Sequence, residues 1–320
     1  MIGIWFLVQI RDVIIFVFLS ILLLSALLKP VDWLNIRGIP RVLSVALVYV
    51  LMIVLISSAF GIIVPPLISQ TSDFISKLPQ IISTINNFLI FHKIPVEDLS
   101  RVIANQTQQL AGNLIAISRT IFSSVFLLVT ILVFTFYLLL EWKKIIRLVS
   151  SPFSGRQEKK IASIVTKVEK GLGHWVRGQL SLSIVIGLLT FIGLRILGIP
   201  YALPLSLIAG ILEIVPIIGP IVAAIPAILV AFTVAPVMGL AVAALFFIIQ
   251  QLENNFIVPF VMAKVVGLQP PVVIVALLIG AKIAGVGGAF LAVPVLVVGR
   301  IILQEILQEE QKLEDDLVEE

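Results

Sequence analysis

Carboxylates inside apolar segments are the residues of this sequence best suited to chemistry. Glu213 lies between apolar neighbours in the segment I-L-E-I-V-P at 211–216. A carboxylate held in hydrocarbon can carry a proton, bind a cation or accept a hydrogen bond from a solute. The alternative interpretation is structural: Glu213 caps a helix or forms an ion pair with a lysine such as Lys282. Position alone favours the functional role, because a charge in hydrocarbon is costly unless it is used or paired.

A second polar group follows an apolar segment at 250–255, which reads Q-Q-L-E-N-N. Gln250, Glu253 and Asn254 are spaced by three and four residues and share one helical face. That face could line an aqueous path, or it could be the solvated end of a helix. Lys282 could neutralise Glu213 or hold an anionic substrate, although a lysine that snorkels to the membrane edge is the favoured interpretation.

Glycine and proline interrupt the apolar segments near these side chains. Pro216, Gly219 and Pro220 follow Glu213, and Gly287 lies in a glycine-rich stretch at 280–288. A broken helix exposes backbone N–H and C=O dipoles that can bind ions or polar solutes, whereas close helix packing is the plainer explanation. G-P-I-V-A-A-I-P at 219–226 and G-G-A-F-L-A-V-P at 287–294 share the first Gly, the sixth Ala and the last Pro. This match predicts two related broken-helix hairpins, of the kind that form substrate sites in secondary transporters, unless it arose by chance.

Signatures of other protein classes are missing from the sequence. It contains no G-x-x-x-x-G-K-[ST], H-E-x-x-H or G-x-S-x-G motif, so we expect no enzyme and no catalytic residue. It has no cysteine, and its two histidines are isolated, so we expect no metal site and no cofactor. The net charge of +4 does not predict nucleic-acid binding, because the basic residues lie at the ends of apolar segments.

Composition places the chain in a lipid bilayer. Hydrophobic residues make up 60% of it and charged residues only 12%, with a mean hydropathy of +1.18. The apolar segments lack the alternation of a β-barrel, so the predicted fold is all-α and polytopic, including the two Gly/Pro-broken hairpins.

The charge pattern predicts how the chain is arranged across the membrane. A first apolar segment is predicted to end at Lys29-Pro30, and the dense basic stretch at 143–177 is predicted to be cytoplasmic. The predicted parts are membrane helices at 1–68, extracytoplasmic amphipathic helices at 69–120, a membrane helix at 121–142, a cytoplasmic basic amphipathic helix at 143–178, a transport core at 179–303 and an acidic tail at 304–320.

An ordered set of motifs resembles the autoinducer-2 exporter family of bacterial and archaeal membrane proteins. They are K-P-V-D-W-L at 29–34, G-I-P-R at 38–41, L-G-I-P-Y-A at 197–202, E-I-V-P-I-I-G-P at 213–220, Q-Q-L-E-N-N at 250–255, Pro259, G-L-Q-P at 267–270 and A-V-P at 292–294. The resemblance implies a multi-pass permease of the cytoplasmic membrane, with about eight membrane segments of roughly 20 residues each. Relatives usually carry a longer apolar N-terminal helix, so the resemblance predicts a truncated start.

Three functions remain open from the sequence. The first is ion-coupled secondary transport of a small solute such as autoinducer-2, which relatives are described as exporting. The second, also implied by the resemblance, is a sodium-or-lithium/proton antiporter. The third is a non-transporting membrane scaffold, a homo-oligomer in which the broken helices would have no use. The expected partners are thus a solute or ion and the lipid bilayer.

Overall fold

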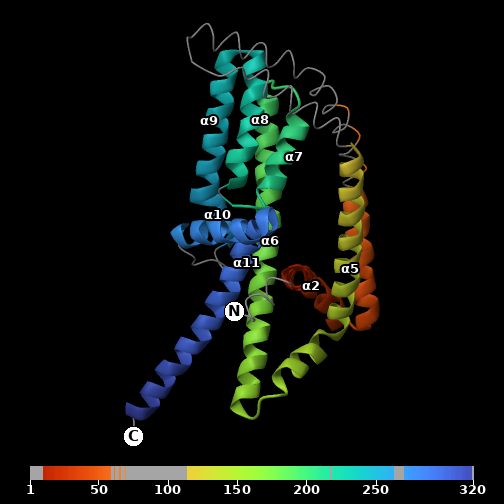
Figure 1. Ribbon diagram of the computed structural model, residues 1–320, viewed down its shortest axis with the longest axis vertical. Helices are drawn as coiled ribbons and strands as arrows, with labels where there is room; N and C mark the ends of the chain where they lie inside the picture. The colour runs from red at the N-terminus through yellow and green to blue at the C-terminus, as the bar shows by residue number, and fades with distance from the viewer. Residues whose placement is uncertain are drawn as a thin grey trace. The chain divides into compact units, whose positions relative to one another are not determined.

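The computed structural model describes residues 10–58, 114–216, 218–262 and 270–318, together with the single positions 61, 65 and 69. Every regular element in these ranges is a helix (Figure 1). Most of the predicted extracytoplasmic helices at 69–120 lie outside the described residues. The chain divides into two compact units: the first comprises Met1–Met52, Leu127–Gly178 and Met262–Glu320, and the second comprises Ile53–Phe126 and Gln179–Val261.

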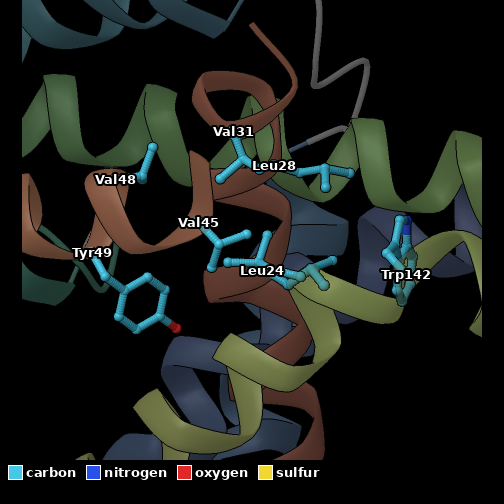
Figure 2. Close-up of a cluster of buried hydrophobic side chains, with 8 residues drawn as sticks. Leu24, Leu28, Val31, Val45, Val48, Tyr49 and Trp142 are labelled. Carbon is cyan, nitrogen blue, oxygen red and sulfur yellow. The ribbon is translucent and has the colours of Figure 1, made fainter. Parts of the chain in front are cut away.

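The first unit is built around an apolar cluster shared by three helices. These helices are α2 (Arg11–Ile36), the helix Arg41–Ser58 up to Met52, and α5 (Leu114–Ser150) from Leu127 onward. Figure 2 shows Val45 among the side chains of Leu24 and Val31, with Tyr49 and Trp142 at the edges of the cluster. The Tyr49 hydroxyl donates to the Leu132 carbonyl at 2.9 Å, so the one polar atom of this ring is satisfied.

The predicted end of the first apolar segment at Lys29-Pro30 was wrong, because α2 continues through Pro30 to Ile36. Proline has no N–H to give to the carbonyl four residues earlier, here that of Ala26. The Arg177 guanidinium, from α6 (Arg156–Ile196), supplies the missing donor: its Nη1 donates to the carbonyls of Ser25 at 3.2 Å and Ala26 at 3.4 Å. Gly173 permits this approach, since a Cβ there would collide with the Ser25 carbonyl oxygen. A contact between helices thus keeps α2 intact at a residue that usually ends one.

The second unit is a bundle of helices that continues from α6. Its elements are α7 (Ala202–Leu212), α8 (Ile218–Val234), α9 (Pro236–Leu252), a π-helix at Glu253–Ile257 and α10 (Val258–Met262). Figure 1 shows α7, α8 and α9 running beside one another. Small residues lie at the centre of the bundle, where Ala223, Ala227 and Ala231 are fully buried at four-residue spacing. That spacing puts one smooth face of α8 against its neighbours.

The last helix, α11 (Pro270–Val318), is interrupted inside the glycine-rich stretch. Ala284 and Gly285 have non-helical backbone angles, and Gly285 has a φ of 58° that glycine tolerates best. The backbones of Gly280 and Gly288 are in close contact across the bend, so that a Cβ on either residue would collide with the carbonyl oxygen of the other. The interruption falls within the predicted 280–288 stretch. That this segment and α7–α8 form membrane hairpins remains a prediction.

The helices are those of a multi-pass membrane protein. Among the described residues, five helices are long and apolar enough to cross a bilayer, and three shorter apolar helices accompany them: Ala202–Leu212, Ile218–Val234 and Pro271–Gly285. Large aliphatic side chains lie exposed along their outer faces, for example Leu47, Leu51 and Val54 on one helix. Such faces suit lipid rather than water. The all-α, membrane-spanning fold class is therefore confirmed, while the number of about eight segments stays a prediction.

Candidate transport site

Glu213 lies at the end of α7, where the backbone turns into α8. Its N–H donates the last α-helical hydrogen bond of α7, to the Ala209 carbonyl at 3.0 Å. A turn follows, in which the Val215 N–H donates to the Leu212 carbonyl at 3.0 Å. Pro216 lies in this turn, which ends where Gly219 N–H donates to Val215 at 2.9 Å. The Glu213 side chain is only 1% exposed, so this turn carries a carboxyl group into the protein interior.

Gly219 allows the start of α8 to press against the end of α7. A Cβ at Gly219 would collide with the Leu212 carbonyl oxygen and would lie 3.1 Å from the Glu213 backbone nitrogen. Pro220 follows in the first turn of α8, where a missing N–H costs nothing, because the first N–H groups of a helix have no intrahelical partner. The Gly-Pro pair therefore positions α8 beside Glu213.

Glu253 opens the π-helix that follows α9. Its carbonyl accepts from the N–H of Val258, five residues on, in place of the usual four. Pro259, next in sequence, has no N–H for the Asn255 carbonyl, which accounts for an interrupted α-helical ladder at this point. Glu253 is 4% exposed, and Gln250 Nε2 donates to its Oε2 at 3.3 Å and to Asn254 Oδ1 at 3.5 Å.

The fold brings the two carboxylic acids together. The carboxyl groups of Glu213 and Glu253, forty residues apart in the chain, lie within hydrogen-bonding reach of each other. Glu213 Oε2 is buried and has no hydrogen-bond partner among the described residues. Neither carboxyl group forms an ion pair with a basic residue that the structure describes. Since two carboxyl groups can hydrogen-bond to each other only through a proton on one of them, this contact is a place where a proton can reside.

Lys282 and Gly287 were also predicted for this site. Both belong to the first unit, at the bend of α11, and the Lys282 side chain is exposed. Gly287 has no other part of the chain within 4 Å of where a Cβ would stand. The described contacts of the carboxyl pair come from the second unit alone, so roles for Lys282 and Gly287 remain predictions.

Gln179 of α6 was missed by the sequence reasoning. It is 4% exposed, and its Nε2 donates to the Glu213 carbonyl at 2.6 Å, which fixes the end of α7. A signal was present, since Gln179 and Ser183 recur four residues apart at the start of an apolar segment and so lie on one helical face. Within the described residues, no group of three or more His, Cys, Asp or Glu side chains is arranged to hold a metal ion.

Comparisons with known proteins identify the family of this chain. The family model described as AI-2E family transporter matches residues 1–308. "Putative transport protein YrrI" of Bacillus subtilis is 30% identical over 93% of this chain and 88% of its own length. The similarly named YueF of the same organism is 26% identical, covering 89% of this chain and 82% of its own, and YhhT of Escherichia coli K12 is 26% identical, covering 92% and 84%. The chain therefore belongs to the AI-2E family of membrane transport proteins.

Proposed function

We propose that the protein is a secondary transporter that moves a small organic solute, such as autoinducer-2, across the cytoplasmic membrane in exchange or symport with protons. Family membership supports membrane transport, and the buried contact between Glu213 and Glu253 supports the coupling. This contact is the single observation that carries the proposal.

Charge balance is the reason that the pair would bind a proton. Two ionised carboxylates in contact would repel each other and would lose their hydration, and the described residues offer no cation to offset either cost. One shared proton removes the repulsion and provides the donor for the hydrogen bond. Loss of that proton leaves two like charges in contact, and the pair must then separate, bind a cation or admit water.

The surrounding backbone could respond to such a change. Glu213 lies in the turn between α7 and α8, and Glu253 lies on a π-helix. The α-helical hydrogen-bond pattern ends at both positions, although each N–H still bonds to the carbonyl four residues earlier, and transporters commonly build their coupling sites at interrupted helices. Protonation could thus bias the arrangement of α7, α8 and α9, which are packed together.

The test is flux through purified protein in liposomes that contain a pH-sensitive dye, with autoinducer-2, sodium, lithium or potassium added in turn. Glu213→Gln and Glu253→Gln keep a hydrogen-bonding group but cannot exchange a proton. Glu141→Gln is the matched control, because Glu141 is an exposed residue of α5 that pairs with Lys144 three residues away. We expect proton movement driven by autoinducer-2 that both buried variants lose and the control retains.

Other outcomes would count against the proposal. Proton movement driven by sodium or lithium alone would make the protein an antiporter. Solute flux that continues unchanged in Glu213→Gln would remove the carboxyl pair from the mechanism. Absence of flux of every solute would favour a membrane scaffold instead.

A further inference from the structure

Three buried polar atoms lack a hydrogen-bond partner within the described parts of the chain, and all three lie in the second unit. They are Ser183 Oγ and Thr190 Oγ1 of α6, and Oε2 of Glu213. Thr190 is fully buried and Glu213 is 1% exposed. Buried polar groups nearly always have a partner, because an unpaired one costs about 1–3 kcal/mol. Three in one unit therefore need an explanation.

Local geometry does not force these hydroxyl groups to go unpaired. Elsewhere in the protein, helical hydroxyls donate to the carbonyl four residues earlier: Ser20 to Phe16 at 2.9 Å, Ser25 to Ile21 at 2.7 Å, and Thr166 to Ala162 at 2.8 Å. The last of these residues is on α6 itself. Ser183 and Thr190 have the same option and do not use it.

Both residues lie along the contact between α6 and α7. Gln179 bonds to Glu213, a Cβ on Gly210 would come 2.8 Å from the Ser183 carbonyl oxygen, and a Cβ on Gly187 would come 3.5 Å from the Ser206 carbonyl oxygen. Residues further along α6 therefore contact residues earlier in α7, so the two helices are antiparallel. Thr190 follows Gly187 by three residues on the same face.

This contact forms a polar seam, which we define as Gln179, Ser183 and Thr190 of α6 with Ser206 of α7 and Glu213, the residue that follows α7. Two glycines, Gly187 and Gly210, let the backbones of the two helices approach each other closely within it. Apolar residues border the far end, where Leu194, one turn beyond Thr190, belongs to the buried core with Leu205 and Ala227. The two unpaired hydroxyls and the carboxyl oxygen of Glu213 could serve as partners for ordered water, because each water needs two to four polar groups around it.

We propose that water molecules held along the polar seam connect Thr190 and Ser183 to Glu213 and relay protons to and from the carboxyl pair. This proposal rests on the proposed function and deepens it. Ser183 and Thr190 are seven residues apart, which is roughly 10 Å along a helix. About three waters span that length at a hydrogen-bond spacing of about 2.8 Å.

Hydroxyl groups suit this task because each donates one hydrogen bond and accepts others. A proton moves along such a chain by forming an O–H bond to one oxygen as the next O–H bond breaks. The number of protons on the seam is unchanged at the end, and Glu213 gains or loses one. Ser183 and Thr190 act here as positioning residues for water.

The test follows the proton itself by infrared spectroscopy of the protein in liposomes. A protonated carboxyl group has a C=O stretching band that shifts when its proton is replaced by deuterium. The part of this band that Glu213→Gln removes belongs to the pair. We would measure how fast that part shifts after transfer to D2O in the wild type, Thr190→Val, Thr190→Ser, Ser183→Ala and the control Thr166→Val, whose hydroxyl is bonded within its own helix.

We expect Thr190→Val to slow the exchange by about tenfold, which corresponds to about 1.4 kcal/mol of added barrier. Thr190→Ser should restore the rate, and Thr166→Val should leave it unchanged. Ser183→Ala provides an independent arm if Thr190→Val fails to fold. If Thr190→Val and Ser183→Ala both exchange as fast as the wild type, the proposed water path along the polar seam is wrong, while the carboxyl pair is unaffected. Absence of the Glu213 band from the wild type would overturn the proposed function as well.

Discussion

Arg177 should stabilise the first unit chiefly because Pro30 leaves the Ala26 carbonyl without its helical donor. Its guanidinium donates to the carbonyls of Ser25 and Ala26. Hydrogen bonds to a charged donor contribute about 1.5–3 kcal/mol. We therefore expect Arg177→Met, which keeps most of the side-chain length, to lower the free energy of unfolding by about 2 kcal/mol.

Pro30→Ala changes the size of this effect. Alanine returns an N–H to position 30, and that N–H can bond to the Ala26 carbonyl in the ordinary helical pattern. In this background Arg177 is no longer the replacement donor for Ala26, and Arg177→Met should lower the free energy of unfolding by only about 1 kcal/mol. The expected coupling between the two positions is thus about 1 kcal/mol, above the 0.3–0.5 kcal/mol within which independent mutations add.

The measurement is an equilibrium unfolding titration of the four proteins of this double-mutant cycle in mixed detergent micelles, followed by tryptophan fluorescence. Trp142 and Trp175, both buried in the first unit, would report its loss. Arg177 also interacts electrostatically with the buried Glu169. That contribution is present in both backgrounds and cancels from the coupling. Strictly additive effects of the two mutations would refute the account of how α2 passes through Pro30.

Two further predictions concern packing and surface charge. Gly219→Ala should destabilise the second unit, because the new Cβ meets the Leu212 carbonyl, whereas Gly299→Ala in α11, with no other part of the chain within 4 Å, should be neutral or stabilising by up to about 1 kcal/mol. Equal melting temperatures for the two variants in one detergent would contradict this. Lys167→Ala removes an ion pair with Glu305 between α6 and α11, in which Lys167 is half-exposed, and should change the free energy of unfolding by less than about 1 kcal/mol. A larger loss in the same titration would mean that this pair holds α11 in place.

The sequence was informative about the class of fold and about where helices break. Apolar segments and their charged ends predicted a helical membrane protein, because lipid leaves few alternatives for the backbone. The interruptions after Glu213 and near Gly285 were both predicted from glycine and proline. These features depend on local residue types, which a sequence displays directly.

Contacts between distant residues could not be predicted in the same way. The end of α2 was misplaced because the donor that tolerates Pro30 comes from Arg177, about 150 positions further along. Glu213 and Glu253 were each identified singly, but no periodicity relates a turn after one helix to a π-helix after another. The contact between Gln179 and Glu213 could not be predicted, because it is made to a backbone carbonyl, which every residue has and no motif marks.

The two units differ in whether the described buried polar groups have hydrogen-bond partners, and this difference bears on function. In the first unit, Arg41 bonds to both Asp32 and the Leu139 carbonyl, and Arg177 satisfies the carbonyls next to Pro30. In these two places an arginine supplies the hydrogen-bond donor that the neighbouring acceptors need. In the second unit, two hydroxyls and a carboxyl oxygen are buried without a described partner, beside a turn and a π-helix. Burial of unpaired polar groups lowers stability, and their presence together in one unit is what the proposed proton-binding site would require.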